Sequence, residues 1–123
     1  MMKTLAYTLD LVDSPPLIEK YKQYHMKVWP EVLYSVKKSG VLSSKIFLLG
    51  TRLFLYMEVT DDYKAEQLQN LSSGERENEW EMLMRNFQRP VPEAKPHEWW
   101  SEMELVYDLD SQLANISNQS EKE

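Results

Sequence analysis

The sequence predicts a single α+β domain whose elements follow in the order β-α-β-β-α-β, with a polar tail behind it. Residues 3–11 alternate apolar and polar side chains, which is typical of a strand, and residues 17–36 repeat apolar side chains at helical spacing. Two further apolar runs surround Gly50, as in a β-hairpin. A chain of 123 residues with 42 % hydrophobic content is long enough for one domain with a core. We therefore assign residues 1–110 to one domain and residues 111–123 to a disordered C-terminal tail.

The first half of the domain reads as a strand followed by a broken helix. The alternation places four residues on one strand face: Leu5, Tyr7, Leu9 and Leu11. Ser14 followed by Pro15 is a helix start, because serine favours the cap and proline favours the first turn. Pro30 lacks an amide hydrogen, so it ends or kinks this helix near His25, or begins a second helix. Gly40 then closes the helical region with a left-handed backbone conformation.

The second half contains a hairpin, a second interrupted helix and a last strand. Residues 44–49 and 52–59 are the hairpin strands. The interrupted helix is expected over residues 63–71 and again over residues 75–88, with Ser72-Ser73-Gly74 between the two parts. Residues 103–109 alternate again and are the predicted fourth strand.

This order of elements defines the ferredoxin-like motif, an antiparallel four-stranded sheet with both helices on one face. The other sheet face then needs a cover, and its aromatic candidates are Tyr7, Phe47, Phe54, Tyr56 and Tyr107. A small domain rarely exposes so much apolar surface. A two-fold homodimer that packs two such sheets together, the dimeric α/β-barrel arrangement, is the expected solution.

Composition excludes several classes of function. The chain has no cysteine, which removes disulfide and thiolate chemistry and suits a reducing, cytoplasmic location. Two histidines without metal-ligand spacing predict no metal site, and the absence of a glycine-rich phosphate loop predicts no nucleotide cofactor. A net charge of −6 without a basic stripe argues against nucleic acid, and no apolar run has membrane-spanning length. The N-terminus is too polar for a signal peptide.

The segment EKYKQYHMKVWPEV, residues 19–32, carries the candidate chemistry. Tyr21 and His25 are four residues apart and so share one helix face. Carbonyl groups freed by Pro30 would favour the protonated form of His25, as helix C-termini do. The spacing alone favours a structural, hydrogen-bonding histidine on a packing face over a catalytic one, and Trp80 in its own helical stripe is more simply a core residue.

These residues, taken together, resemble the L-rhamnose mutarotase family, which includes relatives proposed to act on L-fucose. The resemblance rests on a YxxxHxxVWPEV pattern at residues 21–32, on IFLLGTRLF at residues 46–54 with Glu58, on EWE with Leu-Met at residues 79–84, and on the proline segment at residues 90–96. It covers residues 3 to 109 in order. It implies a ferredoxin-like fold, a dimer, and interconversion of the α and β anomers of a 6-deoxy-L-hexose without a cofactor.

The resemblance also implies roles for particular residues. His25 is implied as the acid–base group, and Tyr21 as its neighbour that hydrogen-bonds the sugar or relays a proton. Trp80 is implied as a ring that packs on the sugar. Two substrate-binding positions depart from the family pattern: Ser44 stands where rhamnose-type members carry a tyrosine, and Glu81 stands where many carry a second tryptophan. We interpret these departures as a change in the preferred sugar, with a preference for L-fucose.

Two alternatives remain open at this point. One is a haem-degrading or cofactor-free oxygenase on the same dimeric scaffold, since such proteins also use a helix histidine and a tryptophan. The other is a non-catalytic binding module, in which the aromatic face serves a protein partner and His25 is dispensable.

Overall fold

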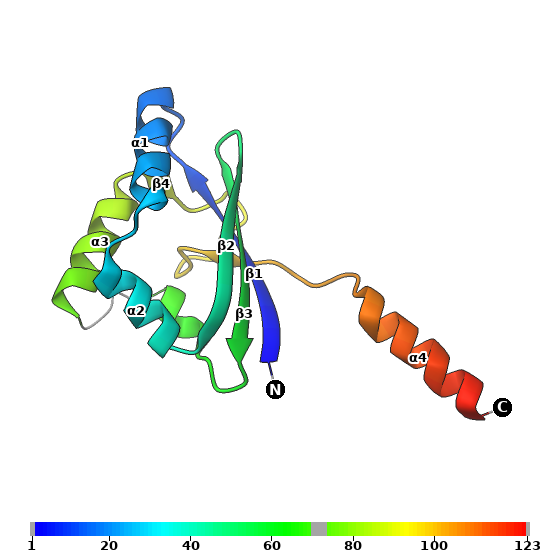
Figure 1. The fold of residues 1–123 in the computed structure, drawn as a ribbon. Helices are drawn as coiled ribbons and strands as arrows, with labels where there is room; N and C mark the ends of the chain where they lie inside the picture. The colour runs from blue at the N-terminus through cyan, green and yellow to red at the C-terminus, as the bar shows by residue number, and fades with distance from the viewer. Residues whose placement is uncertain (1, 70–73, 123) are drawn as a thin grey trace.

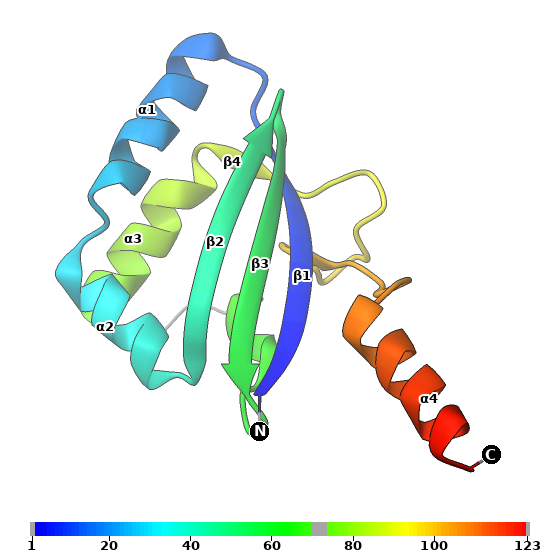
Figure 2. The ribbon, with the colours of Figure 1, turned by 45° about the vertical axis from the view of Figure 1, so that its right-hand side comes forward.

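The computed structural model describes residues 2–69 and 74–122 and shows an antiparallel sheet with helices packed on one face (Figures 1 and 2). The strands are β1 (Met2–Leu11), β2 (Val41–Leu49), β3 (Arg52–Thr60), β4 (Gln88–Arg89) and β5 (Ser101–Glu102). The helices are α1 (Pro15–Met26), α2 (Pro30–Lys38), the short 3-10 helix η1 (Ala65–Leu68), α3 (Glu75–Arg85) and α4 (Leu109–Lys122).

The sheet has the strand order β2-β3-β1-β4, and every pairing is antiparallel. β1 pairs with β3 along its length, from Met2 opposite Thr60 to Asp10 opposite Arg52. β2 completes one edge as the other arm of the predicted hairpin, whose turn contains Gly50 at φ 61°. The predicted α+β class, with an antiparallel ferredoxin-like sheet and its helices on one face, is confirmed.

The predicted fourth strand at residues 103–109 is wrong. The far edge of β1 is occupied instead by two short strands, β4 opposite Asp10 and Leu11 and β5 opposite Tyr7 and Thr8. Pairing ends just beyond β5, where the Met103 amide donates to the Ala6 carbonyl at 2.8 Å. Alternation indicates that one face of a segment will be buried, but it does not identify the surface that buries it.

The break in the first helical region lies where the sequence predicts it. α1 ends at Met26, one residue after His25, and α2 begins at Pro30, so the proline stands at the first position of a new helix. Gly40 follows α2 with φ 109°, and a Cβ there would lie 2.6 Å from Thr60 Oγ1. A residue with a side chain is therefore disfavoured at position 40 for two reasons: the positive φ and the close approach to β3.

The second helical region is shorter than predicted. Only η1 lies within the predicted helix at residues 63–71, and the end of that helix and the break at Ser72-Ser73 lie outside the described residues. α3 begins at Glu75 as expected but ends at Arg85 rather than at residue 88. The helix ends early because Gln88 and Arg89 form the strand β4, which pairs with β1.

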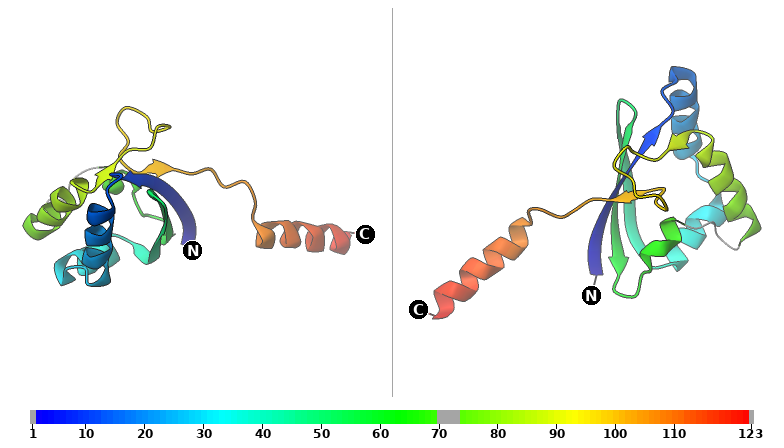
Figure 3. Two further views of the ribbon diagram at one scale, coloured as in Figure 1. Left: turned by 90° about the horizontal axis from the view of Figure 1, so that it is seen from above. Right: turned by 180° about the vertical axis from the view of Figure 1, so that it is seen from behind.

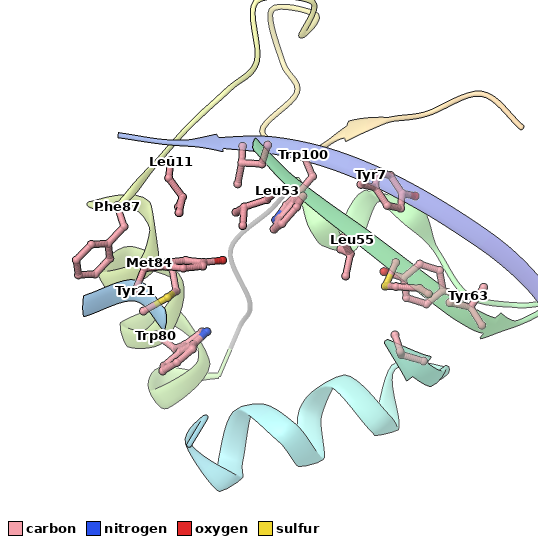
Figure 4. Packing of buried hydrophobic residues seen from close by; sticks show 14 residues of the cluster. Tyr7, Leu11, Tyr21, Leu53, Leu55, Tyr63, Trp80, Met84, Phe87 and Trp100 are labelled. Carbon is pink, nitrogen blue, oxygen red and sulfur yellow. The ribbon is translucent and has the colours of Figure 1, made fainter. Parts of the chain in front are cut away.

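The core lies between the sheet and the helices, as Figure 4 shows. Its fully buried side chains include Tyr7, Leu9, Leu11 and Leu53 from the strands and Met84 from α3. The prediction that Tyr7 lies on the opposite sheet face is wrong: Tyr7 alternates with Leu9 and Leu11 on the core face, and 1 % of it is exposed. Phe47 and Phe54 do lie on the uncovered face.

The C-terminal segment differs from the predicted disordered tail. Residues 109–122 form α4, which projects away from the sheet and the other helices (Figures 1 and 3). Leu109, Leu113 and Ile116 repeat at spacings of four and three residues, which places them on one side of this helix, and each is more than half exposed. A domain boundary at residue 110 stays a prediction.

Candidate active site

A cavity of about 1140 Å³ separates the helices from the β2 side of the sheet. All five predicted site residues line it: Tyr21, His25, Ser44, Trp80 and Glu81. They come from α1, β2 and α3, which are far apart in the sequence. The volume lies above the usual range for drug-sized ligands, so a monosaccharide and ordered water fit inside together.

α1 presents Tyr21 and His25 side by side, with ring centroids 4.2 Å apart. His25 Nδ1 lies 3.1 Å from the Tyr21 carbonyl oxygen, one helical turn back. Because a carbonyl oxygen only accepts hydrogen bonds, Nδ1 carries the hydrogen and donates it. In the neutral ring the lone pair is then on Nε2. The backbone of α1 thus fixes the tautomer that makes His25 a proton acceptor.

The pKa of His25 is lowered from its ordinary value, because burial disfavours the imidazolium. The hydrogen bond to the Tyr21 carbonyl acts in the opposite direction and is the smaller effect. The prediction that freed helix carbonyls favour the protonated form is therefore wrong in net direction. The carbonyl contact exists, but Trp80, whose ring centroid lies 5.5 Å from that of His25, helps to exclude water from the imidazole.

The Tyr21 phenol is held by a residue that the sequence did not reveal. Gln88 Nε2 donates to Tyr21 Oη at 3.4 Å, and Gln88 Oε1 accepts from Trp99 Nε1 at 2.9 Å. Because Tyr21 Oη accepts this bond, its own hydrogen is available to a molecule in the cavity. Burial raises the pKa of Tyr21 to about 12, so the phenol remains a neutral donor. Figure 4 shows the Tyr21 hydroxyl pointing away from Phe87.

Trp80 is both a core residue and a cavity wall. It is 5 % exposed, and its ring packs edge-on against Tyr24, His25 and Trp29 at centroid distances of 5.2 to 6.1 Å. Such packing fixes the ring orientation. The rigid aromatic surface left toward the cavity can cover the apolar side of a ligand.

Ser44 and Glu81 lie on different walls of the cavity. Ser44 is opposite the buried Met57 in the β2–β3 pairing, so its side chain is on the helix-covered face. Glu81 is partly buried on α3, and burial raises the pKa of its carboxyl, with Arg85 acting in the opposite direction. The two residues add a hydroxyl and a titratable carboxyl to the ligand space.

Within residues 2–69 and 74–122, no group of three or more metal-ligating side chains is assembled. The same part of the chain contains no helix both long and apolar enough to cross a membrane. The features that the cavity does offer are a tautomer-fixed imidazole, a neutral phenol, carboxyl groups and an aromatic wall. This combination is typical of an enzyme that moves protons on a small polar molecule.

Comparisons with known proteins agree with this class. The family described as L-rhamnose mutarotase matches residues 4–109. An L-fucose mutarotase of Xanthomonas campestris is 37 % identical over 111 residues, covering 88 % of this chain and 89 % of its own. A UPF0734 protein of Dictyostelium discoideum is 46 % identical over 113 residues, covering 88 % of this chain and 90 % of its own. The crystal structure of an L-rhamnose mutarotase from Formosa agariphila superposes with a TM-score of 0.65 at 24 % identity, covering 87 % of this chain and 98 % of its own.

The protein is therefore an isomerase of the mutarotase kind. The chain belongs to the L-rhamnose mutarotase family. The matched region includes five residues that line the cavity: Tyr21, His25, Ser44, Trp80 and Glu81.

Proposed function

We propose that this protein interconverts the α and β anomers of a 6-deoxy-L-hexose, with His25 as an acid–base group and Tyr21 as a hydrogen-bond donor to the sugar. The observation that carries the proposal is the pairing on α1, in a mutarotase-family chain, of an imidazole with a fixed tautomer and a neutral phenol on one cavity wall. Anomer exchange opens and recloses the sugar ring, so it needs proton transfers and no redox cofactor.

The aromatic wall supports a deoxy sugar as the substrate. A 6-deoxyhexose has one methyl group and several hydroxyl groups, and so it needs an apolar contact beside hydrogen-bonding groups. Trp80 supplies a buried, oriented ring, while Ser44 and Glu81 supply polar groups on other walls. These residues are the proposed substrate-binding set.

L-Fucose is the preferred candidate within this class. The relative named an L-fucose mutarotase is 37 % identical to this chain, whereas an L-rhamnose mutarotase of Enterococcus faecalis is 27 % identical. Glu81 can accept hydrogen bonds from hydroxyl groups that an aromatic side chain cannot bind. A site with a carboxyl group at this position therefore suits a sugar whose hydroxyl groups are arranged differently from those of a sugar bound between two tryptophans.

Saturation-transfer NMR of anomeric protons tests the activity directly. We expect protein-dependent exchange between the anomers of L-fucose, weaker exchange for L-rhamnose, and none above background for D-glucose, which lacks the 6-methyl group. If no sugar shows exchange that depends on the protein, the mutarotase proposal fails. Titration with haemin, followed by the Soret band, would then test the oxygenase alternative.

We further propose that the protein is a homodimer joined through the uncovered sheet face. Phe47 and Phe54 lie there with ring centroids 6.0 Å apart, and they are 56 % and 36 % exposed. Next to them the Tyr56 hydroxyl donates to Glu58 at 2.8 Å. Apolar surface of this kind marks interaction sites, and a two-fold axis lets one patch cover its own copy.

Light scattering at micromolar concentration checks the dimer. We expect the mass of two chains for the native protein and of one chain for the Phe47→Glu, Phe54→Glu double variant, because two like charges would face each other across the axis. Met82→Glu is the matched control, since Met82 is 62 % exposed on α3 in the opposite layer. A native protein with the mass of one chain would contradict the proposal.

We also propose a cytoplasmic location. The sequence contains no cysteine, so it gains nothing from an oxidising compartment, where disulfides form and persist. Fractionation of cells that express the full chain tests this location.

A further inference from the structure

The proposed reaction needs two proton-transfer sites, and His25 supplies one. On ring opening, the anomeric hydroxyl loses its proton, the C1–O1 bond becomes a carbonyl, and the electron pair of the broken C1–O5 bond takes up a proton on O5. After rotation about C1–C2, the O5 hydroxyl attacks the other carbonyl face and both transfers run in reverse. Atoms and electrons balance without a further reactant. A base at one oxygen and an acid at the other serve each half of the cycle.

Most of the residues around the sugar space are unsuited to the second role. The Tyr21 phenol has a pKa of about 12, because burial outweighs the hydrogen bond from Gln88, and the charge of Glu81 adds a smaller upward effect. It therefore donates a hydrogen bond but seldom releases the proton. The Ser44 hydroxyl and the Trp80 indole do not titrate in the working range of an enzyme.

Glu81 differs from these residues in both chemistry and placement. It lies on α3, far from His25 and Tyr21 in the sequence, but it lines the same cavity as these two residues. It directly follows Trp80, whose ring centroid lies 5.5 Å from that of His25. Among the described residues, no hydrogen bond or ion pair engages its side chain, so both oxygens are available to a ligand.

We propose that Glu81 is the second acid–base group of the mutarotase, exchanging a proton with one sugar oxygen while His25 serves the other. This inference rests on the proposed function and extends it from substrate binding to the chemical step. The pair works when it holds one proton in total, so that one member is the acid and the other is the base. Each half of the cycle then returns the pair to a singly protonated state.

The burial of Glu81 and His25 shifts their pKa values in opposite directions, each toward the ordinary value of the other. Burial raises the pKa of Glu81 and lowers that of His25. Charged and titratable groups from the neighbouring elements share this environment: Tyr21 on α1, Lys37 on α2, Lys45 on β2, Tyr63 and Lys64 after β3, Glu66 on η1, and Glu77 and Arg85 on α3. Arg85 opposes the upward shift of Glu81, and Lys37 is engaged by the Leu42 carbonyl at 2.7 Å.

The test is the anomer exchange rate of Glu81→Gln with the sugar that the native protein turns over fastest. We expect kcat to fall by about 10²–10⁴-fold with KM changed only a few-fold, because glutamine keeps the shape and hydrogen bonding but carries no exchangeable acid. Glu81→Asp should retain part of the rate. Glu79→Gln is the matched control on the same helix, where Glu79 pairs with Arg76 at 2.9 Å and does not line the cavity.

The pH profile of kcat/KM separates an acid–base role from a structural one. For the native protein we expect a bell, because activity falls when both groups are protonated and again when both are deprotonated. Glu81→Gln should leave a single limb, from His25 alone.

Each outcome of these measurements bears on a different proposal. No exchange by the native protein with any sugar refutes the proposed function. An active native protein with unchanged kcat in Glu81→Gln, or with an effect on KM alone, refutes the role of Glu81 and leaves the mutarotase intact. Should Glu81→Gln fail to fold, Glu81→Asp and the native pH profile decide, and a native profile with one limb overturns the proposal.

Discussion

His25→Ala is expected to reduce protein-dependent anomer exchange by about 10²–10⁴-fold while leaving the fold unchanged. His25 lines the cavity, and its Nδ1 hydrogen is engaged by the Tyr21 carbonyl at 3.1 Å. This geometry leaves Nε2 as the proton-transfer atom, and alanine removes it. Saturation-transfer NMR with L-fucose measures the rate, and circular dichroism checks the fold.

The second histidine provides a matched control. His97 is exposed and does not line the cavity, so His97→Ala should exchange anomers at the native rate. Added imidazole should restore part of the activity of His25→Ala, because it can enter the space left by the side chain, and it should not affect His97→Ala. Native activity in His25→Ala would remove His25 from the mechanism and favour a binding role for this face.

Leu9→Ala should lower the free energy of unfolding by about 3–5 kcal/mol, the largest stability effect expected of a single aliphatic truncation in this fold. Leu9 has no exposed surface and lies opposite the buried Leu53 in the central β1–β3 pair. Its loss leaves a cavity beneath strands that are hydrogen-bonded on both sides and cannot collapse freely. A domain of this size has a total stability of about 5–15 kcal/mol, so the variant should be markedly destabilised.

Urea unfolding followed by circular dichroism measures this effect, at one fixed protein concentration so that association does not alter the comparison. Leu33→Ala is the matched control, since the same truncation is made on α2 at a residue that is 54 % exposed. It should change the unfolding free energy by no more than about 0.5 kcal/mol. Equal effects of the two substitutions would contradict the assignment of the core to the β1–β3 surface.

Local patterns in the sequence were sufficient to predict most of the strands and the break in the first helical region. The alternation in β1 determines which side chains face the core, since successive residues of a strand point to opposite faces. Pro30 and Gly40 mark the bounds of α2 through restrictions on their own backbone. The misplaced fourth strand has a different origin. Residues 103–109 have a strand-like pattern, but the edge of β1 is occupied by β4 and β5, which are only two residues long and carry little periodic signal.

The sequence by itself determined that Tyr21 and His25 share one helix face, because four residues make about one turn. It also pointed to the family through the ordered pattern that includes both residues. Only the tertiary structure decided the state of these groups. Gln88, which holds the Tyr21 hydroxyl, is 67 residues away, and the tryptophan that excludes water from His25 comes from α3. The pKa of a side chain depends on such distant neighbours, because desolvation is imposed by whatever packs around it in space.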